Sequence, residues 1–94
     1  MLDKMKQIME MKKQADQIKR ELDLITVEVN EVRGIKIVIS GSQDFRSLEI
    51  DESLLGVENK GRFQTDLLRS INAAVKKSQS AAAQKMAAFM PGLQ

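Results

Sequence analysis

The sequence predicts an α+β protein with a single domain, residues 1–94, in which a three-stranded antiparallel sheet lies between two long helices. Two observations lead to this prediction. Apolar residues alternate with polar ones through much of residues 26–51, which is typical of a sheet with one dry face and one wet face. In residues 3–25 and 62–89 the apolar residues instead recur every three or four positions, which indicates helices. The predicted order of elements is therefore α-β-β-β-α.

Residues 3–25 are predicted to form the first helix. Its apolar positions recur at alternating steps of three and four, as in a heptad: Ile8, Met11, Ala15, Ile18, Leu22 and Ile25. At about 1.5 Å per residue this helix is on the order of 35 Å long, which is more than a three-stranded sheet can cover. Part of the helix must therefore project, and we expect its apolar seam to pack against another helix.

The first two strands are predicted to form a hairpin around a three-residue loop, residues 32–34. Gly34 would take the left-handed conformation there at no steric cost. The register that follows pairs residues on the dry and wet faces in this way: Val29 with Ile37, Val27 with Ile39, Glu28 with Val38, and Asn30 with Lys36. A third strand is predicted from Phe45 to Ile50, so the sheet is an antiparallel meander. In that strand Leu48 and Ile50 are expected to face the core.

The second long helix is predicted over residues 62–89. Its first half carries bulky apolar residues on one face and is expected to lie on the sheet. Its second half is rich in Ala and Ser, so we expect it to project and to allow close approach of a neighbour. Pro91 is expected to end the helix, because the residue before a proline is disfavoured in the helical region.

The composition argues against an enzyme. The chain has no His and no Cys, so the commonest general base, metal ligand and nucleophile are missing. We therefore expect no cofactor, no metal site and no small-molecule substrate. No apolar run approaches the roughly 20 residues of a membrane span, so no membrane association is expected. The absence of Cys is compatible with the reducing cytoplasm.

The amount of apolar material indicates association of several copies. The chain has three Phe and no Trp or Tyr, and its other apolar residues are divided between one small sheet and two long helices. A monomer would leave much of that surface in water. The sequence therefore favours a homo-oligomer.

Charge is distributed unevenly along the chain. Residues 24–58 contain three basic and seven acidic residues, whereas residues 59–94 contain six basic residues and only Asp66 as an acid. Uncancelled Lys and Arg on a helix surface are what phosphate binding requires. The candidate DNA-binding residues are Lys76, Lys77, Lys85 and Arg69 on the second helix, with Lys12, Lys13 and Lys19 of the first helix in support. Asn72 is expected to be structural. The competing interpretation is that these charges form an ordinary solvated face.

Several stretches together resemble the YbaB/EbfC family of bacterial nucleoid-associated proteins. They are Lys6-Gln7, Met11-Lys12-Lys13-Gln14, Ile37-Val38-Ile39-Ser40-Gly41, Leu48-Glu49-Ile50-Asp51, Ser53-Leu54-Leu55, Asp66-Leu67-Leu68, Ile71-Asn72-Ala73-Ala74 and Lys85-Met86. The resemblance implies a homodimer whose sheets form the body and whose long helices project like tweezers. It also implies binding of double-stranded DNA with little sequence preference, in the cytoplasm at the nucleoid, with roles in nucleoid organisation and gene regulation. The hairpin loop is shorter here than is usual for the family.

Two interpretations follow for the surfaces of the protein. In the first, a homodimer binds duplex DNA through the phosphate backbone, with a dimer interface on the strands at Val27, Val29, Ile37, Ile39 and Leu48. In the alternative, the Met-rich and Ala-rich helix surfaces make the protein an adaptor between other proteins. The adaptor would bind its partner whether or not DNA is present.

Overall fold

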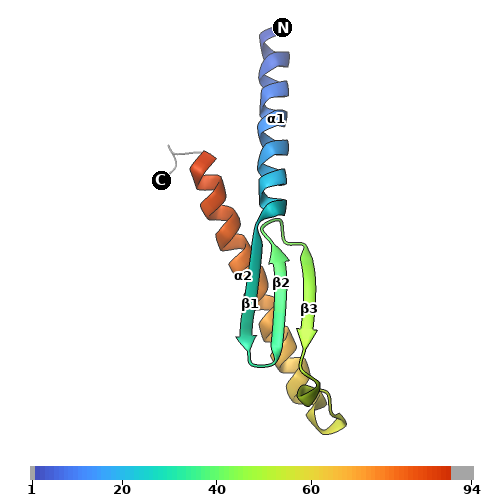
Figure 1. Cartoon of the computed structure of the whole chain (residues 1–94). Helices are drawn as coiled ribbons and strands as arrows, with labels where there is room; N and C mark the ends of the chain where they lie inside the picture. Colours follow the sequence, from blue (N-terminus) through green and yellow to red (C-terminus); the bar gives the residue numbers. More distant parts are fainter. Residues whose placement is uncertain (1, 90–94) are drawn as a thin grey trace.

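The computed structural model describes residues 2–89 and confirms the predicted order of elements (Figure 1). Helix α1 precedes the three strands and helix α2 follows them, and two short 3₁₀ helices, Glu52–Leu54 and Val57–Asn59, lead from the sheet into α2. The bounds of the main elements are α1 Leu2–Leu24, β1 Thr26–Val32, β2 Ile35–Ser40, β3 Phe45–Ile50 and α2 Lys60–Phe89. The expected stop at Pro91 lies outside the described residues.

The sheet is the predicted antiparallel meander, with strand order β1-β2-β3. Most of the predicted hairpin register is confirmed, because Val29 pairs with Ile37, Val27 with Ile39 and Glu28 with Val38. On the wet face Lys36 Nζ lies 3.3 Å from Glu28 Oε1 and 3.9 Å from Glu49 Oε2. Opposite charges on adjacent strands therefore cover the side of the sheet that faces away from α2.

The hairpin loop was predicted wrongly. Val32 pairs with Ile35, so the turn contains only Arg33 and Gly34, and Gly34 has the expected positive φ of 96°. The register shifts between Val29 and Val32, which places two residues of β1 opposite Lys36 alone. Such a β-bulge keeps Val32 on the dry face, where it packs against the core, although strict alternation would turn it outward.

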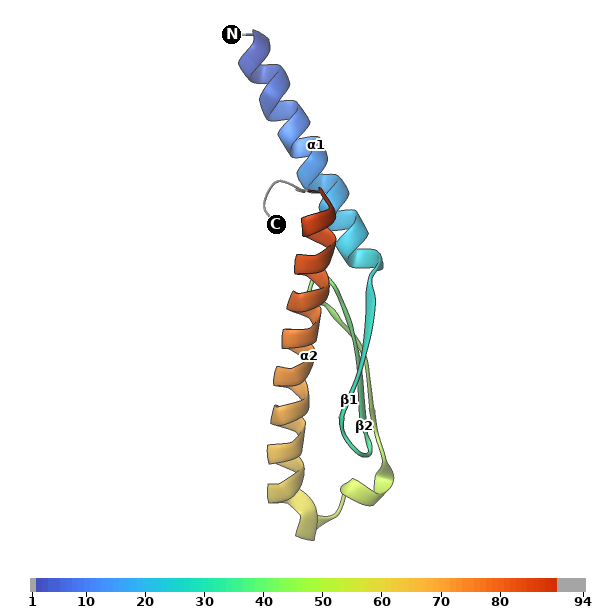
Figure 2. The same cartoon turned by 90° about the vertical axis from the view of Figure 1, so that its left-hand side faces the viewer.

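The core lies between α2 and the first two strands (Figure 2). Its fully buried apolar residues are Val29, Ile35, Ile37, Ile39 and Ala74. The residues of α2 closest to the sheet are small and spaced by four: Ser70, Ala74 and Ser78. The Ser78 hydroxyl donates a 2.7 Å hydrogen bond to the Ser40 carbonyl oxygen. Contact with the sheet therefore extends past the first half of α2, at least as far as Ser78.

Strand β3 is less well covered than the sequence predicted. Leu48 lies directly opposite Ile37 on the dry face, but 52% of Leu48 is exposed whereas Ile37 is 1% exposed. The reason is that α2 packs mainly over β1 and β2. Phe45 is also 52% exposed, and with Leu48 and Ile71 it lines an open apolar hollow beside α2. Leu48 therefore lies on the core side of the sheet as expected but is left half-exposed, while Ile50 is half-buried.

Helix α1 projects beyond the sheet, as expected (Figures 1 and 2). Residues 2–17 are all exposed, including Ile8 and Met11 of the predicted seam. Within residues 2–89 of a single chain, no other helix therefore packs against the seam along residues 2–17. The end of α1 is held by Gly41, whose N–H lies 3.0 Å from the Leu22 carbonyl oxygen. A Cβ atom at Gly41 would lie 2.9 Å from that same oxygen, so only glycine fits without a shift.

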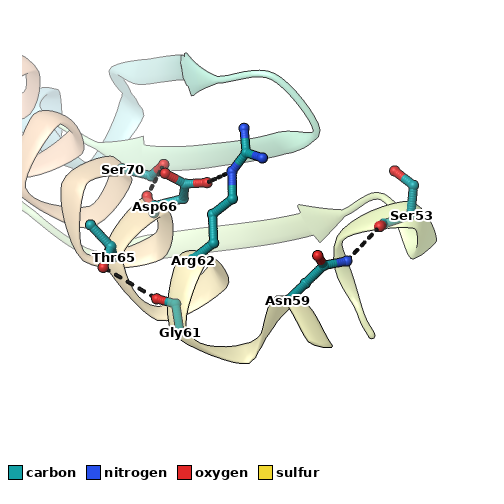
Figure 3. Close-up of polar contacts among 7 residues, drawn as sticks. All are labelled: Ser53, Asn59, Gly61, Arg62, Thr65, Asp66 and Ser70. Carbon is teal, nitrogen blue, oxygen red and sulfur yellow. Dashed lines mark hydrogen bonds and ion pairs between the residues drawn. The ribbon is translucent and has the colours of Figure 1, made fainter. Parts of the chain in front are cut away.

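Short-range polar contacts organise the connection from β3 to α2 (Figure 3). The Ser53 N–H donates a 2.9 Å hydrogen bond to Asp51 Oδ1, and hydrogen bonds from the backbone and side chain of Ser53 lower the pKa of Asp51. The Asn59 amide donates to the Ser53 carbonyl oxygen. In the first turns of α2, Arg62 Nε lies 3.8 Å from Asp66 Oδ2. These contacts fix where α2 begins relative to the sheet.

Candidate nucleic-acid interface

One side of α2 carries the residues that make the candidate interface. Arg69, Asn72, Lys76 and Lys77, together with Ala73, line a hollow of about 400 Å³ whose remaining wall is Glu31 of β1. Residues three, four and seven apart on a helix lie on one side, which explains why these residues meet. We call Arg69, Asn72, Lys76 and Lys77 the basic flank of α2. The structure thus brings three of the predicted DNA-binding residues together.

Lys76 and Lys77 carry the uncancelled charge of the basic flank. Both are exposed. Among residues 2–89, neither ammonium group has a carboxylate oxygen within 4.0 Å. A lysine ammonium that is free of carboxylates can approach a phosphate without first breaking an ion pair. These two residues are therefore the part of the predicted site that is most available to an anion.

Arg69 is paired with an acid that the sequence analysis did not single out. Its Nε lies 3.6 Å from Glu31 Oε1, and the two side chains are 66% and 34% exposed. Glu31 is one of the two residues of the β-bulge. Alternation from the buried Val29 already places the Glu31 side chain on the side of the sheet that α2 covers. The signal in the sequence was the two-residue spacing that places Glu31 on the same face as Val27 and Val29.

Lys85 lies apart from Lys76 and Lys77, at the place where α2 meets α1. Its Nζ is 3.6 Å from Glu21 Oε2, and the two side chains are 43% and 33% exposed. That carboxylate oxygen is buried and has no hydrogen-bond partner among the described residues, so Lys85 supplies its compensating charge. The neighbour that the Ala-rich half of α2 approaches is thus the last part of α1 in the same chain.

The pairing predicts a structural cost for removing the Lys85 charge. Lys85→Met should lower the free energy of unfolding by about 1–2 kcal/mol, because the Glu21 carboxylate would be left half-buried without a counter-charge. Thermal unfolding followed by circular dichroism measures this change. Adding Glu21→Gln to Lys85→Met should recover most of the lost stability. A single variant as stable as the parent would show that the pair does not stabilise the junction.

The predicted residues of α1 are not part of the basic flank. Lys12, Lys13 and Lys19 are exposed, and Lys12 and Lys13 lie on the part of α1 that projects past the sheet. Their surroundings also contain acids, since Lys12 and Lys13 line a shallow hollow together with Glu10 and Asp16. The projecting helix therefore offers a mixed surface, whereas the basic flank of α2 is cationic apart from Glu31.

Two expectations about side chains need correction. Val29, Ile37 and Ile39, predicted at a dimer interface, are at most 1% exposed in the single chain because α2 covers them, so their side chains have no surface left for a second copy. Val27 is half-buried and Leu48 is open. Asn72, expected to be structural, is exposed and lines the hollow of the basic flank.

Residues 2–89 offer neither a group of metal ligands nor a membrane-spanning helix. No group of three or more acidic residues in residues 2–89 is arranged to hold a metal ion. None of the helices described is both long and apolar enough to cross a lipid bilayer. The fold and the site define a small α+β protein with one projecting helix and a cationic flank on the other helix.

The chain belongs to the YbaB/EbfC DNA-binding family, whose model matches residues 1–93. This family is one of DNA-binding proteins and not of enzymes. A nucleoid-associated protein of Syntrophobacter fumaroxidans is 29% identical over 95% of this chain and 82% of its own length. A nucleoid-associated protein of Pelotomaculum thermopropionicum is 32% identical over 87% of this chain and 79% of its own. The fold matches a crystal structure of an uncharacterized protein from Helicobacter pylori, with TM-score 0.73, 21% identity and coverage of 88% and 87% of the two chains.

Proposed function

We propose that this protein is a nucleoid-associated protein that binds duplex DNA mainly through its phosphates. The observation that carries the proposal is the pair of exposed lysines, Lys76 and Lys77, without carboxylate partners in the described chain and next to Arg69 and Asn72. Membership of a DNA-binding family and the names of the relatives support it. The protein would act at the nucleoid in the cytoplasm, in nucleoid organisation and gene regulation.

The chemistry of the basic flank favours phosphate contacts over base reading. Lysine ammonium groups act as point charges that neutralise phosphates irrespective of sequence. Base reading needs planar or bidentate donors that enter a groove, and on the flank only Arg69 and Asn72 have that shape. Arg69 is already paired with Glu31. Weak sequence preference follows from this set of residues.

We propose further that the protein works as a homodimer. Two apolar surfaces of the single chain are open: the seam of α1 with Ile8 and Met11, and the face of β3 with Phe45 and Leu48. A second copy that covered β3 would use Leu48 of the predicted interface and leave the basic flanks of both copies in solvent. Two flanks held in one particle would bind one duplex more tightly than either flank alone.

A salt series tests the phosphate proposal. With four phosphate contacts per dimer, from two lysines on each flank, the slope of log K against log salt should be about −3.6. Affinity for a duplex of random sequence should then fall roughly 150-fold between about 50 and 200 mM salt. Fluorescence anisotropy with the full chain measures this, and unlabelled duplexes of other sequences serve as competitors. A flat salt response, or no binding at the lowest salt concentration, would contradict the proposal.

The adaptor alternative is favoured by one observation, the exposure of Met5, Met9 and Met11 on α1, which are 63%, 69% and 68% exposed. Methionine-rich surfaces adapt to different partners. An adaptor would retain its protein partner after nuclease treatment of a cell extract, whereas association that depends on DNA would be lost.

A further inference from the structure

We infer that Glu31 is an internal competitor for DNA phosphates, and that its carboxylate limits the affinity of the basic flank. The inference rests on the proposed function and deepens it, because it assigns a role to an acid inside the proposed phosphate site. Glu31 is the acidic residue in a hollow otherwise lined by Arg69, Asn72, Ala73, Lys76 and Lys77.

The position of Glu31 is set by the backbone of β1. The bulge between Val29 and Val32 places both Asn30 and Glu31 opposite Lys36. Asn30 lies with Lys36 and Glu49 in a hollow on the wet face, whereas Glu31 lies with α2. Glu31 thus follows the alternation from Val29 and places one carboxylate on the side of the sheet where the lysines of α2 lie, and the extra residue of the bulge keeps Val32 on that side as well.

The Glu31 carboxylate occupies a position beside Arg69 that a phosphate would need in order to pair with the same guanidinium. Its Oε1 lies 3.6 Å from Arg69 Nε, which is an ion-pair distance, so the carboxylate already balances the charge of that guanidinium. Arg69 is 66% exposed and can therefore be reached from solvent while Glu31 approaches it from the strand. A phosphate that approached Arg69 would meet a negative charge already present, and the two anions would repel each other.

The consequence for binding is a smaller effective charge. Arg69, Lys76 and Lys77 each carry a positive charge, and Glu31 cancels that of Arg69. Without the carboxylate, Arg69 becomes available to bind a phosphate of its own. Every additional phosphate that the flank neutralises makes the salt slope steeper by about 0.9. Glu31 would thus keep the complex weak enough to dissociate readily at moderate salt.

The test is Glu31→Gln, which removes the charge and keeps the length of the side chain. Affinity for a random duplex should rise roughly 3- to 10-fold, with a steeper salt slope. Glu28→Gln is the matched control, because Glu28 is on the same strand and also pairs with a cation, Lys36 at 3.3 Å, but on the wet face. It should change affinity less than twofold. Glu31→Thr, which suits a strand, provides a second variant should the Gln variant fold poorly.

A double-mutant cycle with Arg69→Gln separates the specific effect from a general change in net charge. If Glu31 acts by occupying Arg69, the increase in affinity from Glu31→Gln should largely disappear when Arg69 is absent. Unchanged or weaker binding by Glu31→Gln and Glu31→Thr, an increase equal to that of Glu28→Gln, or the same increase in the Arg69→Gln background would each overturn the inference. Failure of the proposed function can be told apart from failure of this inference, because the parent chain itself would then show no salt-dependent binding of duplex DNA.

Discussion

Replacing Lys76 and Lys77 together with Glu is expected to weaken binding of duplex DNA at least roughly 100-fold at about 100 mM salt. The double variant loses two phosphate contacts on each flank and adds two negative charges that repel the backbone. Both lysines are exposed and have no acidic partner in the described chain, so the change should leave thermal stability almost unaltered. Fluorescence anisotropy gives the affinity, and circular dichroism shows whether the helices are retained.

The matched control reverses the same number of charges on the other helix. Lys12→Glu with Lys13→Glu alters the projecting part of α1, where Glu10 and Asp16 already lie nearby. A smaller loss is expected there, because that surface is nearly neutral before the change. If the α1 variant lost more affinity than the α2 variant, the projecting helix would be the main contact with DNA. Normal binding by the α2 variant would remove Lys76 and Lys77 from the site.

The second large effect concerns stability: Ile37→Ala should lower the free energy of unfolding by about 2–5 kcal/mol. Ile37 lies on the central strand beneath α2 and is 1% exposed, so its truncation removes buried apolar area and leaves a cavity. Denaturant unfolding of the full chain measures the loss. A cost below about 1 kcal/mol would mean that the core is not closed around Ile37.

Leu48 supplies the comparison, because it sits directly opposite Ile37 in the sheet and is half exposed. In an isolated chain Leu48→Ala should lower the free energy of unfolding clearly less than Ile37→Ala does, since less apolar area is buried at Leu48.

If two copies meet over β3, as we propose, Leu48→Glu should halve the mass measured by sedimentation while the helices persist. A particle that stays dimeric with Leu48→Glu would place the interface elsewhere, with the exposed seam of α1 as the next candidate.

The basic residues illustrate why the number of charges in a segment does not by itself locate a binding site. Six basic residues occur in residues 59–94, but the structure uses Lys85 to neutralise Glu21 and places Arg69 beside Glu31. Arg62 lies 3.8 Å from Asp66 on the same helix. The candidate site is therefore narrower than the sequence suggested, and it has an acidic residue within it.

Periodicity along the chain was enough to predict the order of the elements, most of the strand register and the helix that bears the free lysines. Alternation pairs Val29 with Ile37, and steps of three and four group Arg69 with Lys76. Three features became visible only once the elements were packed together: Glu31 pairs with Arg69, Lys85 meets Glu21, and β3 stays partly uncovered. Such contacts between elements depend on how a helix lies across the sheet, which does not follow from local pattern.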